Sequence, residues 1–241
     1  MLGLGNSVSA SQYPGGWLPS DEAKLEAWYR FDTGITITES DGVSKWEDSS
    51  SNTFHMLQAD AGEQPAFANG ILTFDPTSDT QNLQSSSSIE LDGTFVLGFR
   101  IDPAANGVVV IGSNSVANEM IKLQDSTLIR VKNDSETDNY ALETGHDTKD
   151  DAYWVISRNS SNEMSVHKDG VLQEAAKTNG GTFDINSLGV RRTDLNPYNG
   201  TMKEVVIFKA VADAKIEALR LNLQDRSVSY THLTLPTNRE V

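Results

Sequence analysis

The chain has 241 residues, of which 37% are hydrophobic and none is cysteine, and its formal net charge is −15. This is enough apolar material for a sizeable core, and the length is compatible with a single all-β domain. The excess of 34 acidic over 19 basic residues argues against nucleic acid and anionic membranes as partners. Without cysteine there are no disulfides, thiolate zinc sites or cysteine nucleophiles. No apolar run is long enough for membrane insertion, and no secretory signal is visible.

The beginning of the chain predicts an arm followed by one domain. Residues 1–19 are rich in Gly, Ser, Asn and Pro, which is typical of an extended N-terminal arm. Residues 20–226 are expected to form a β domain, because short apolar or alternating runs are separated by Gly, Asp, Asn and Ser. Within this domain, Glu22–Trp28 is compatible with one short helix.

Alternation and short apolar runs predict the strands. Thr94–Ile101 alternates and predicts a half-buried strand, whereas Val108–Ile111 is apolar throughout and predicts a strand covered on both faces. Asp169-Gly170 lies between two strand-like runs and predicts a type I′ hairpin turn, which needs positive φ at both residues. Further strands are predicted at Leu128–Lys132, Tyr153–Ser157, Glu163–Lys168 and Val205–Phe208.

Two different segments close the chain. Ile216, Leu219 and Leu223 recur at helical spacing after Asp213, so an amphipathic helix is expected to cap the β domain. Val228–Thr237, by contrast, resembles the translated mosaic end and adapter of a transposase-based sequencing library. That resemblance implies a non-native tail over residues 227–241, which is excluded from fold reasoning.

Four stretches carry a resemblance to a fold family. They are Leu25–Asp32, Val43–Asn52, Val166–Leu172 and Asn199–Phe208. In this order and at this spacing they resemble the laminin-G-like jelly roll of the concanavalin A-like lectin and glucanase superfamily. The resemblance implies an all-β fold, a two-sheet antiparallel jelly-roll sandwich with one C-terminal helix. The superfamily includes sugar-binding, protein-binding and hydrolytic members, so the fold alone does not assign a function.

The catalytic motif of this superfamily is missing. Its hydrolases carry a Glu-x-Asp-x-x-Glu strand, whose alternation places the catalytic carboxylates on one face. Three segments begin this pattern, but the third acidic position holds Ser44, Phe95 and Ala141. No single strand therefore supplies the carboxylate pair of a glycosidase, and we expect the chain not to be an enzyme.

An acidic segment is the candidate metal site. Asp134, Glu136 and Asp138 place carboxylates at every second position, and carboxylate oxygens are the ligands that calcium prefers. The segment is not an EF-hand loop, because Asn139 and Gly145 occupy the positions that need Gly and Glu. The family resemblance implies calcium in loops at the sheet rim, while an ordinary solvated acidic turn is the alternative.

Two tyrosines with neighbouring amides are the candidate sugar site. An aromatic ring can stack on a sugar, and amides can hydrogen-bond its hydroxyl groups. Asn139 precedes Tyr140, and Tyr198 lies between Asn196 and Asn199. Ordinary packing of the two rings is the alternative.

The leading functional hypothesis is a non-catalytic virion component. The opening Met1–Asn6 resembles the start of some structural proteins of marine bacteriophages. This implies a tail- or capsid-associated protein that binds a host glycan or a neighbouring subunit. The alternatives are a carbohydrate-binding adhesion module on a bacterial cell surface and, third, a glycoside hydrolase. Edge strands and the arm also favour a homo-oligomer.

Overall fold

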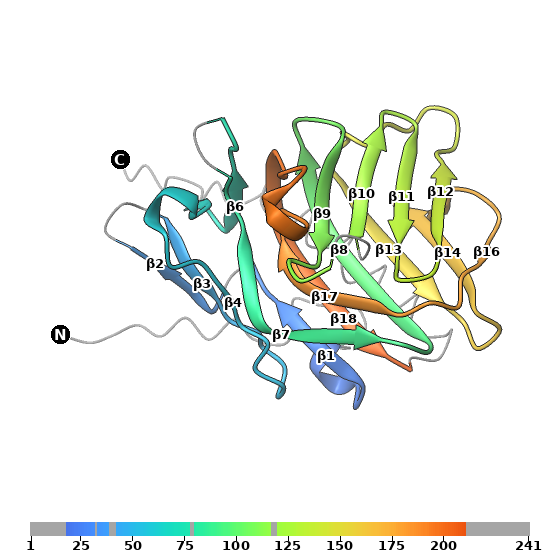
Figure 1. Ribbon diagram of the computed structural model, residues 1–241, viewed down its shortest axis with the longest axis horizontal. Coiled ribbons are helices and arrows are strands. Elements are labelled where there is room, and N and C mark those ends of the chain that lie inside the picture. The colour runs from blue at the N-terminus through green and yellow to red at the C-terminus, as the bar shows by residue number, and fades with distance from the viewer. Residues whose placement is uncertain (1–17, 32, 39–41, 78–79, 117–119, 211–241) are drawn as a thin grey trace, which may run out of the picture.

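The chain folds as a β-sandwich. The computed structural model describes residues 18–31, 33–38, 42–77, 80–116 and 120–210, whose strands form two stacked antiparallel sheets (Figure 1). The predicted all-β, two-sheet class is thereby confirmed. The predicted C-terminal helix, nearly all of the arm and the tail lie outside the described residues.

The β8 sheet is named after its central strand. Its strands are β1 (Leu25–Tyr29), β5 (Ala66–Ala68), β6 (Ile71–Phe74), β8 (Phe95–Pro103), β13 (Ala152–Arg158), β14 (Glu163–Lys168), β15 (Val171–Leu172), β16 (Lys177–Thr178) and β18 (Gly200–Lys209). Their order in the described chain is β15-β14-β13-β8-β18-β6-β5, with β1 also on β18 and β16 also on β14. The last strand of the described chain therefore lies in the interior of its sheet.

The β10 sheet forms the other layer. Its strands are β2 (Ile35–Ile37), β3 (Val43–Trp46), β4 (Met56–Leu57), β7 (Leu83–Leu91), β9 (Val108–Gly112), β10 (Met120–Asp125), β11 (Leu128–Lys132), β12 (Thr137–Ala141) and β17 (Phe183–Leu188). Their order in the described chain is β12-β11-β10-β9-β17-β7-β4-β3-β2. Figure 1 shows β9 to β12 side by side at one end of the molecule.

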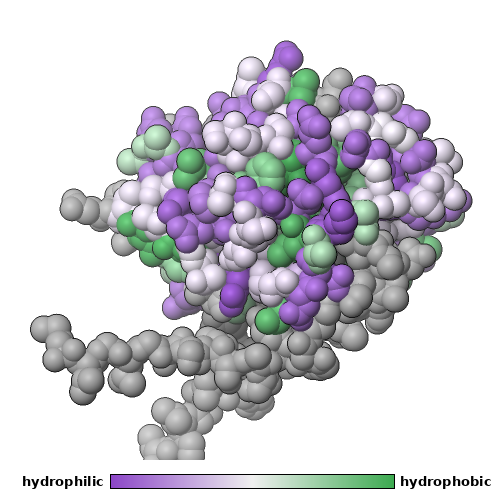
Figure 2. All heavy atoms as spheres, turned by 90° about the horizontal axis from the view of Figure 1, so that it is seen from below, coloured by the Kyte–Doolittle hydropathy of each residue, from purple (hydrophilic) through white to green (hydrophobic). Residues whose placement is uncertain are grey.

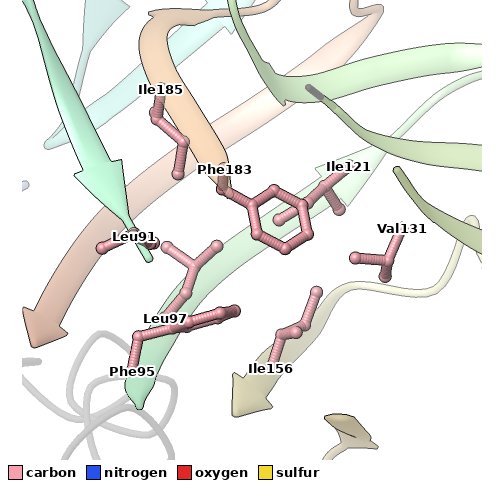
Figure 3. A pocket seen from close by; sticks show the side chains of 8 residues that line it. All are labelled: Leu91, Phe95, Leu97, Ile121, Val131, Ile156, Phe183 and Ile185. Carbon is pink, nitrogen blue, oxygen red and sulfur yellow. The ribbon is translucent and has the colours of Figure 1, made fainter. Parts of the chain in front are cut away.

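The main core lies between the sheets. It is filled by every second residue of the strands, whose side chains point inward. At one end, Phe95 and Phe183 meet edge to face with ring centroids 5.6 Å apart. Around them, side chains from both sheets converge and leave no space for a water molecule (Figure 3). The small apolar space between these side chains is therefore part of the packed core and is not a ligand pocket.

The outer face of the β8 sheet carries a second apolar cluster. Its buried residues are Trp28, Val96, Tyr153, Val155, Val206 and Phe208. The prediction of a half-buried strand at Thr94–Ile101 is wrong for this reason, since Val96 is only 2% exposed on the face expected to meet solvent. The prediction that Val108–Ile111 is covered on both faces is confirmed.

The local predictions near Trp28 and Asp169 had opposite outcomes. The short helix at Glu22–Trp28 is wrong, because β1 begins at Leu25 and pairs with β18. Burying Ala27 and Tyr29 in the core outweighs local helix propensity. A 3-10 turn at Pro19–Asp21 precedes the strand, and two further 3-10 turns cover Ala61–Glu63 and Arg192–Asp194.

The Asp169-Gly170 hairpin is confirmed, with φ of 48° and 82°.

One buried carboxylate joins the first two family-like stretches. Asp48 is 6% exposed and accepts hydrogen bonds from the backbone N–H groups of Trp28 at 2.9 Å, Ser50 at 2.8 Å and Phe54 at 3.0 Å. Because these donors come from β1 and from the loop after β3, the acidic residue fixes the loop against the edge of β1.

Candidate functional site

Polar side chains form a row across the outer face of the β10 sheet. Lys122 on β10 pairs with Arg130 on β11, and Arg130 pairs with Asn139 on β12. Their strand neighbours Leu123 and Ile129 lie in the core, so alternation directs the three polar side chains outward. The Arg130 Nε donates a hydrogen bond to the Asn139 Oδ1 at 2.9 Å, which fixes the orientation of both groups.

The loop after β17 continues this row beyond β9. Lys122 pairs with Val109, whose N–H donates to the carbonyl of Asn196 at 2.8 Å. The Asn196 Nδ2 donates to the carbonyl of Gly107 at 3.1 Å, so the loop is held along β9. The Arg191 Nε in turn donates to the Asn196 Oδ1 at 3.0 Å. We call Lys122, Arg130, Asn139, Arg191 and Asn196 the polar row.

The polar row concentrates positive charge on an acidic protein. Partial burial of Lys122, together with the nearby guanidiniums of Arg130 and Arg191, lowers the pKa of its ammonium group. Within the described chain, the ion pairs involve neither Lys122 nor Arg130. Facing like charges on neighbouring strands are unfavourable, so this arrangement costs the fold some stability.

The structure brings two of the predicted sugar-binding amides together. Asn139 and Asn196 both belong to the polar row, although they are 57 positions apart in the sequence. Asn199 lies elsewhere, in the turn before β18, where its carbonyl accepts a hydrogen bond from the N–H of Ala104 at 2.9 Å. The amide chemistry predicted from sequence is therefore present on one face, without Asn199.

The predicted stacking role of the two tyrosines is incompatible with their burial. Tyr140 and Tyr198 are both 0% exposed, which leaves no ring face for a sugar. The Tyr140 hydroxyl donates to the carbonyl of Met164 at 3.1 Å, and the Tyr198 hydroxyl donates to the carbonyl of Thr201 at 2.9 Å. Burial raises the pKa of both hydroxyls. Both rings belong to the core.

The three predicted calcium ligands are not gathered. The Asp134 Oδ1 accepts from the N–H of Thr182 at 2.8 Å, and the Asp138 Oδ2 accepts from the Asn179 Nδ2 at 2.7 Å, while Glu136 is exposed. Among the residues that the structure describes, no three His, Asp or Glu side chains are placed to hold a metal ion. Here the aspartates connect the β12 turn to the segment before β17.

A groove at the sandwich edge is a second candidate surface. The groove is open to solvent and has a volume of about 560 Å³. It lies where the edge strand β2 approaches β5. Its lining residues are Phe31, Thr33, Gly34, Ile35, Ile37, Phe67 and Gly70. Ile37 is 46% exposed, so this groove presents apolar side chains to solvent.

The described surface on the face shown in Figure 2 is mostly hydrophilic. Seen from below (Figure 2), hydrophobic side chains occur singly or in small groups among polar ones. Among the described segments, no helix has the length and apolar character needed to cross a membrane.

Sequence reasoning missed the cations of the polar row. Lys122 and Arg130 each occupy an outward position of an alternating strand, and a short turn at Ser126–Thr127 connects those strands. Pairing β10 with β11 from that turn would have placed the two charges opposite each other. Arg191 carried no such signal, because the loop around Asn196 positions it.

Solved structures with similar folds include two binding domains and one domain of an extracellular enzyme. Domain 4 of AbnA, an extracellular arabinanase from Geobacillus stearothermophilus solved with arabinotriose, has a TM-score of 0.53 and 18% identity over 83% of this chain and 99% of that one. The binding domain of Paraclostridial Mosquitocidal Protein 1 has a TM-score of 0.50 and 14% identity over 84% of this chain and 52% of that one. What this chain shares with these domains is the two-sheet antiparallel β-sandwich.

A third structure is the binding domain of botulinum neurotoxin DC in complex with rat synaptotagmin II, with a TM-score of 0.50 and 15% identity over 86% of this chain. The chain spans about half the length of this domain and of the mosquitocidal one, at 52% for each. No protein-family model matches the chain, and no curated protein sequence matches it. At these identities the similarities show the fold alone.

Proposed function

We propose that this protein is a non-catalytic recognition module that binds carbohydrate through the polar row. The observation that carries the proposal is the row itself, in which Asn139 and Asn196 flank Lys122 and Arg130 on one outer sheet face. Amide groups both donate and accept hydrogen bonds, while ammonium and guanidinium groups donate them. Such a set suits the hydroxyl and ring oxygens of a saccharide.

The non-catalytic part of the proposal is supported by the acidic groups. Asp102 and Asp151 lie close enough for the charge of Asp151 to contribute, after burial, to raising the pKa of Asp102. The carboxylate of Asp151, however, is ion-paired with Arg100 at 2.7 Å and with Lys203 at 3.4 Å. This pairing suits a structural role on the outer face of the β8 sheet better than acid–base chemistry. Turnover of β-glucan polymers by the purified chain would contradict it.

A glycan array tests the binding proposal. The full chain is applied with calcium and again with a chelator, beside the variants Asn139→Ala and Lys24→Ala. Lys24 is the matched control, because it is exposed and precedes β1 of the other sheet. We expect binding to a defined glycan class that Asn139→Ala weakens and Lys24→Ala does not. Silence of the folded wild-type chain across the array would refute the proposal.

For the biological context we propose a virion, with the module tail- or capsid-associated and facing the host. The similarity of Met1–Asn6 to phage structural proteins supports this context, and a bacterial cell-surface adhesion module is the alternative. Mass spectrometry of purified particles tests it. Absence of the protein from the particles, or a secretion signal upstream of Met1 in the source DNA, would favour the cell-surface alternative.

Contact with a neighbouring protein subunit is the second candidate function. The edge groove favours it, because Ile37 and Phe67 offer apolar surface beside the sheet edge at β2. The substitution Ile37→Lys would then weaken self-association or binding to a virion protein. Light scattering of wild type and variant measures this, and equal masses that remain monomeric across the concentration range would exclude a homo-oligomer.

A further inference from the structure

We propose that the ligand of the polar row is an acidic saccharide, whose carboxylate or sulfate group is held between Lys122, Arg130 and Arg191. This inference rests on the proposed function and names the chemical class of its ligand.

The geometry of the row provides for an anion. Lys122 and Arg130 are directly opposite each other on adjacent antiparallel strands, where Cβ atoms lie about 4.5–5.5 Å apart. The bond between the Arg130 Nε and Asn139 fixes one guanidinium, and the bond between the Arg191 Nε and Asn196 fixes the other. One anionic group can therefore receive charge-assisted hydrogen bonds from the two preoriented guanidiniums, on β11 and on the loop after β17, and from the ammonium group of Lys122 on β10.

The electrostatics also favour an anion. The chain carries 34 acidic residues, yet within the described part no carboxylate is ion-paired with Lys122 or Arg130. The lowered pKa of Lys122 records the unfavourable surroundings of that ammonium group. A bound anion would reverse the sign of this interaction and raise the pKa of Lys122 again.

The distribution of aromatic rings disfavours a neutral sugar. An exposed aromatic ring would add apolar contact with the face of a neutral saccharide, but none of the large hydrophobic residues exposed in the described chain is aromatic. The half-buried Phe31 and Phe67 line the edge groove, and the tyrosine nearest the row, Tyr140, points into the core. With hydrogen-bond donors and charge but no ring, the row gains most from a negatively charged ligand.

A nucleic acid fits this row less well than a glycan. Three cations release only a few counterions from a phosphate backbone. The net charge of −15 also repels a long polyanion outside the row, whereas a short acidic saccharide meets the row alone. Affinity for an acidic saccharide should fall as salt is raised, because the contacts are partly exposed.

Matched pairs of probes test the inference by titration calorimetry. The probes are a heparin tetrasaccharide beside its desulfated form, and sialyllactose beside lactose, with a DNA oligonucleotide as a third polyanion. The protein is the full chain as wild type, Lys122→Gln, Arg130→Gln and the control Lys24→Gln. We expect binding to at least one acidic probe and not to its neutral counterpart. Lys122→Gln and Arg130→Gln should each weaken it by about tenfold or more, and Lys24→Gln by less than about twofold.

The outcomes separate the inference from the function on which it rests. Equal binding of neutral and acidic partners, unchanged in Lys122→Gln, would overturn the inference and leave a carbohydrate-binding module. Failure of every saccharide in this set and on the glycan array would overturn both. DNA bound as tightly as the acidic saccharides would overturn the glycan assignment in favour of a general polyanion surface. Both variants should melt at or above the wild-type temperature, because each removes one of two facing like charges.

Discussion

Arg158 offers the sharpest test of what holds the two sheets together. Its side chain is 2% exposed, and the nitrogen atoms of its guanidinium group donate hydrogen bonds to backbone carbonyls of separate segments. The Nε donates to Gly93 at 2.7 Å and one terminal nitrogen donates to Leu91 at 3.0 Å. The other donates to Asn179 at 3.3 Å and to Gly181. Its guanidinium also lies 5.1 Å from the centre of the Phe95 ring.

The substitution Arg158→Met keeps much of the apolar stem and removes the donors. A hydrogen bond that involves a charged group contributes about 1.5–3 kcal/mol. Counting only the bonds to Gly93 and Leu91, at about 2 kcal/mol each, gives a loss of about 4 kcal/mol. That is a large share of the 5–15 kcal/mol that stabilises a typical domain. For a domain of this size it corresponds to a drop in Tm of about 8–16 °C.

Urea and thermal unfolding followed by near-UV circular dichroism measure this loss. Arg158→Lys, which keeps the charge but fewer donors, should fall between wild type and Arg158→Met. Arg130→Met is the surface control and should change Tm by less than about 2 °C, because within the described residues its side chain donates a hydrogen bond to Asn139 alone, on the sheet surface. A Tm for Arg158→Met within about 3 °C of wild type would refute the reasoning.

Three further predictions concern single contacts. Asp48→Ala removes the acceptor of three backbone N–H groups and should lower the free energy of unfolding by about 2–4 kcal/mol; an unchanged urea midpoint would contradict it. The hydrogen bond from Lys168 holds the pKa of Asp150 below its ordinary value of 3.8, so the stability it adds is present above about pH 4 and is lost as pH falls further. Asp150→Asn should therefore flatten the loss of Tm between about pH 5 and about pH 2, and identical profiles would show that the pair is inert. Gly181→Ala places a methyl group against the side chain of Asn133 and should cost about 1–3 kcal/mol, measured by urea unfolding, whereas the open Gly93→Ala should cost less.

Sequence patterns predicted the strands where local signals are strong. The Asp169-Gly170 turn fixes its hairpin by backbone conformation alone, and the apolar run at Val108–Ile111 has one reasonable interpretation. The outer apolar cluster was not predictable in this way. Val96 alternates with core residues as any surface position would, and only the neighbouring strands show that Phe208 lies opposite it, in one cluster with Val155 and Val206.

The candidate site was predicted in part, and the missing part is non-local. Asn139 and Tyr140 are adjacent, so strand alternation sends one outward and the other into the core. The opposite directions of these two side chains could be predicted only by recognising β12 as a strand. The acidic and polar residues around it suggested a loop instead. The role of Asn196 depends on β9, which lies far from it in sequence.

The position of β18 has a consequence for how this chain is made. Gly200–Lys209 pairs with β8 and β6 and supplies the partner of β1, with Leu25 opposite Phe208. Nearly all of the domain must therefore leave the ribosome before the β8 sheet can be completed. During most of synthesis β1 is unpaired, because β18 has not yet been made. Such sequence-distant pairing slows folding and leaves strand edges open in the meantime. Production of this protein should accordingly benefit from slow expression at low temperature.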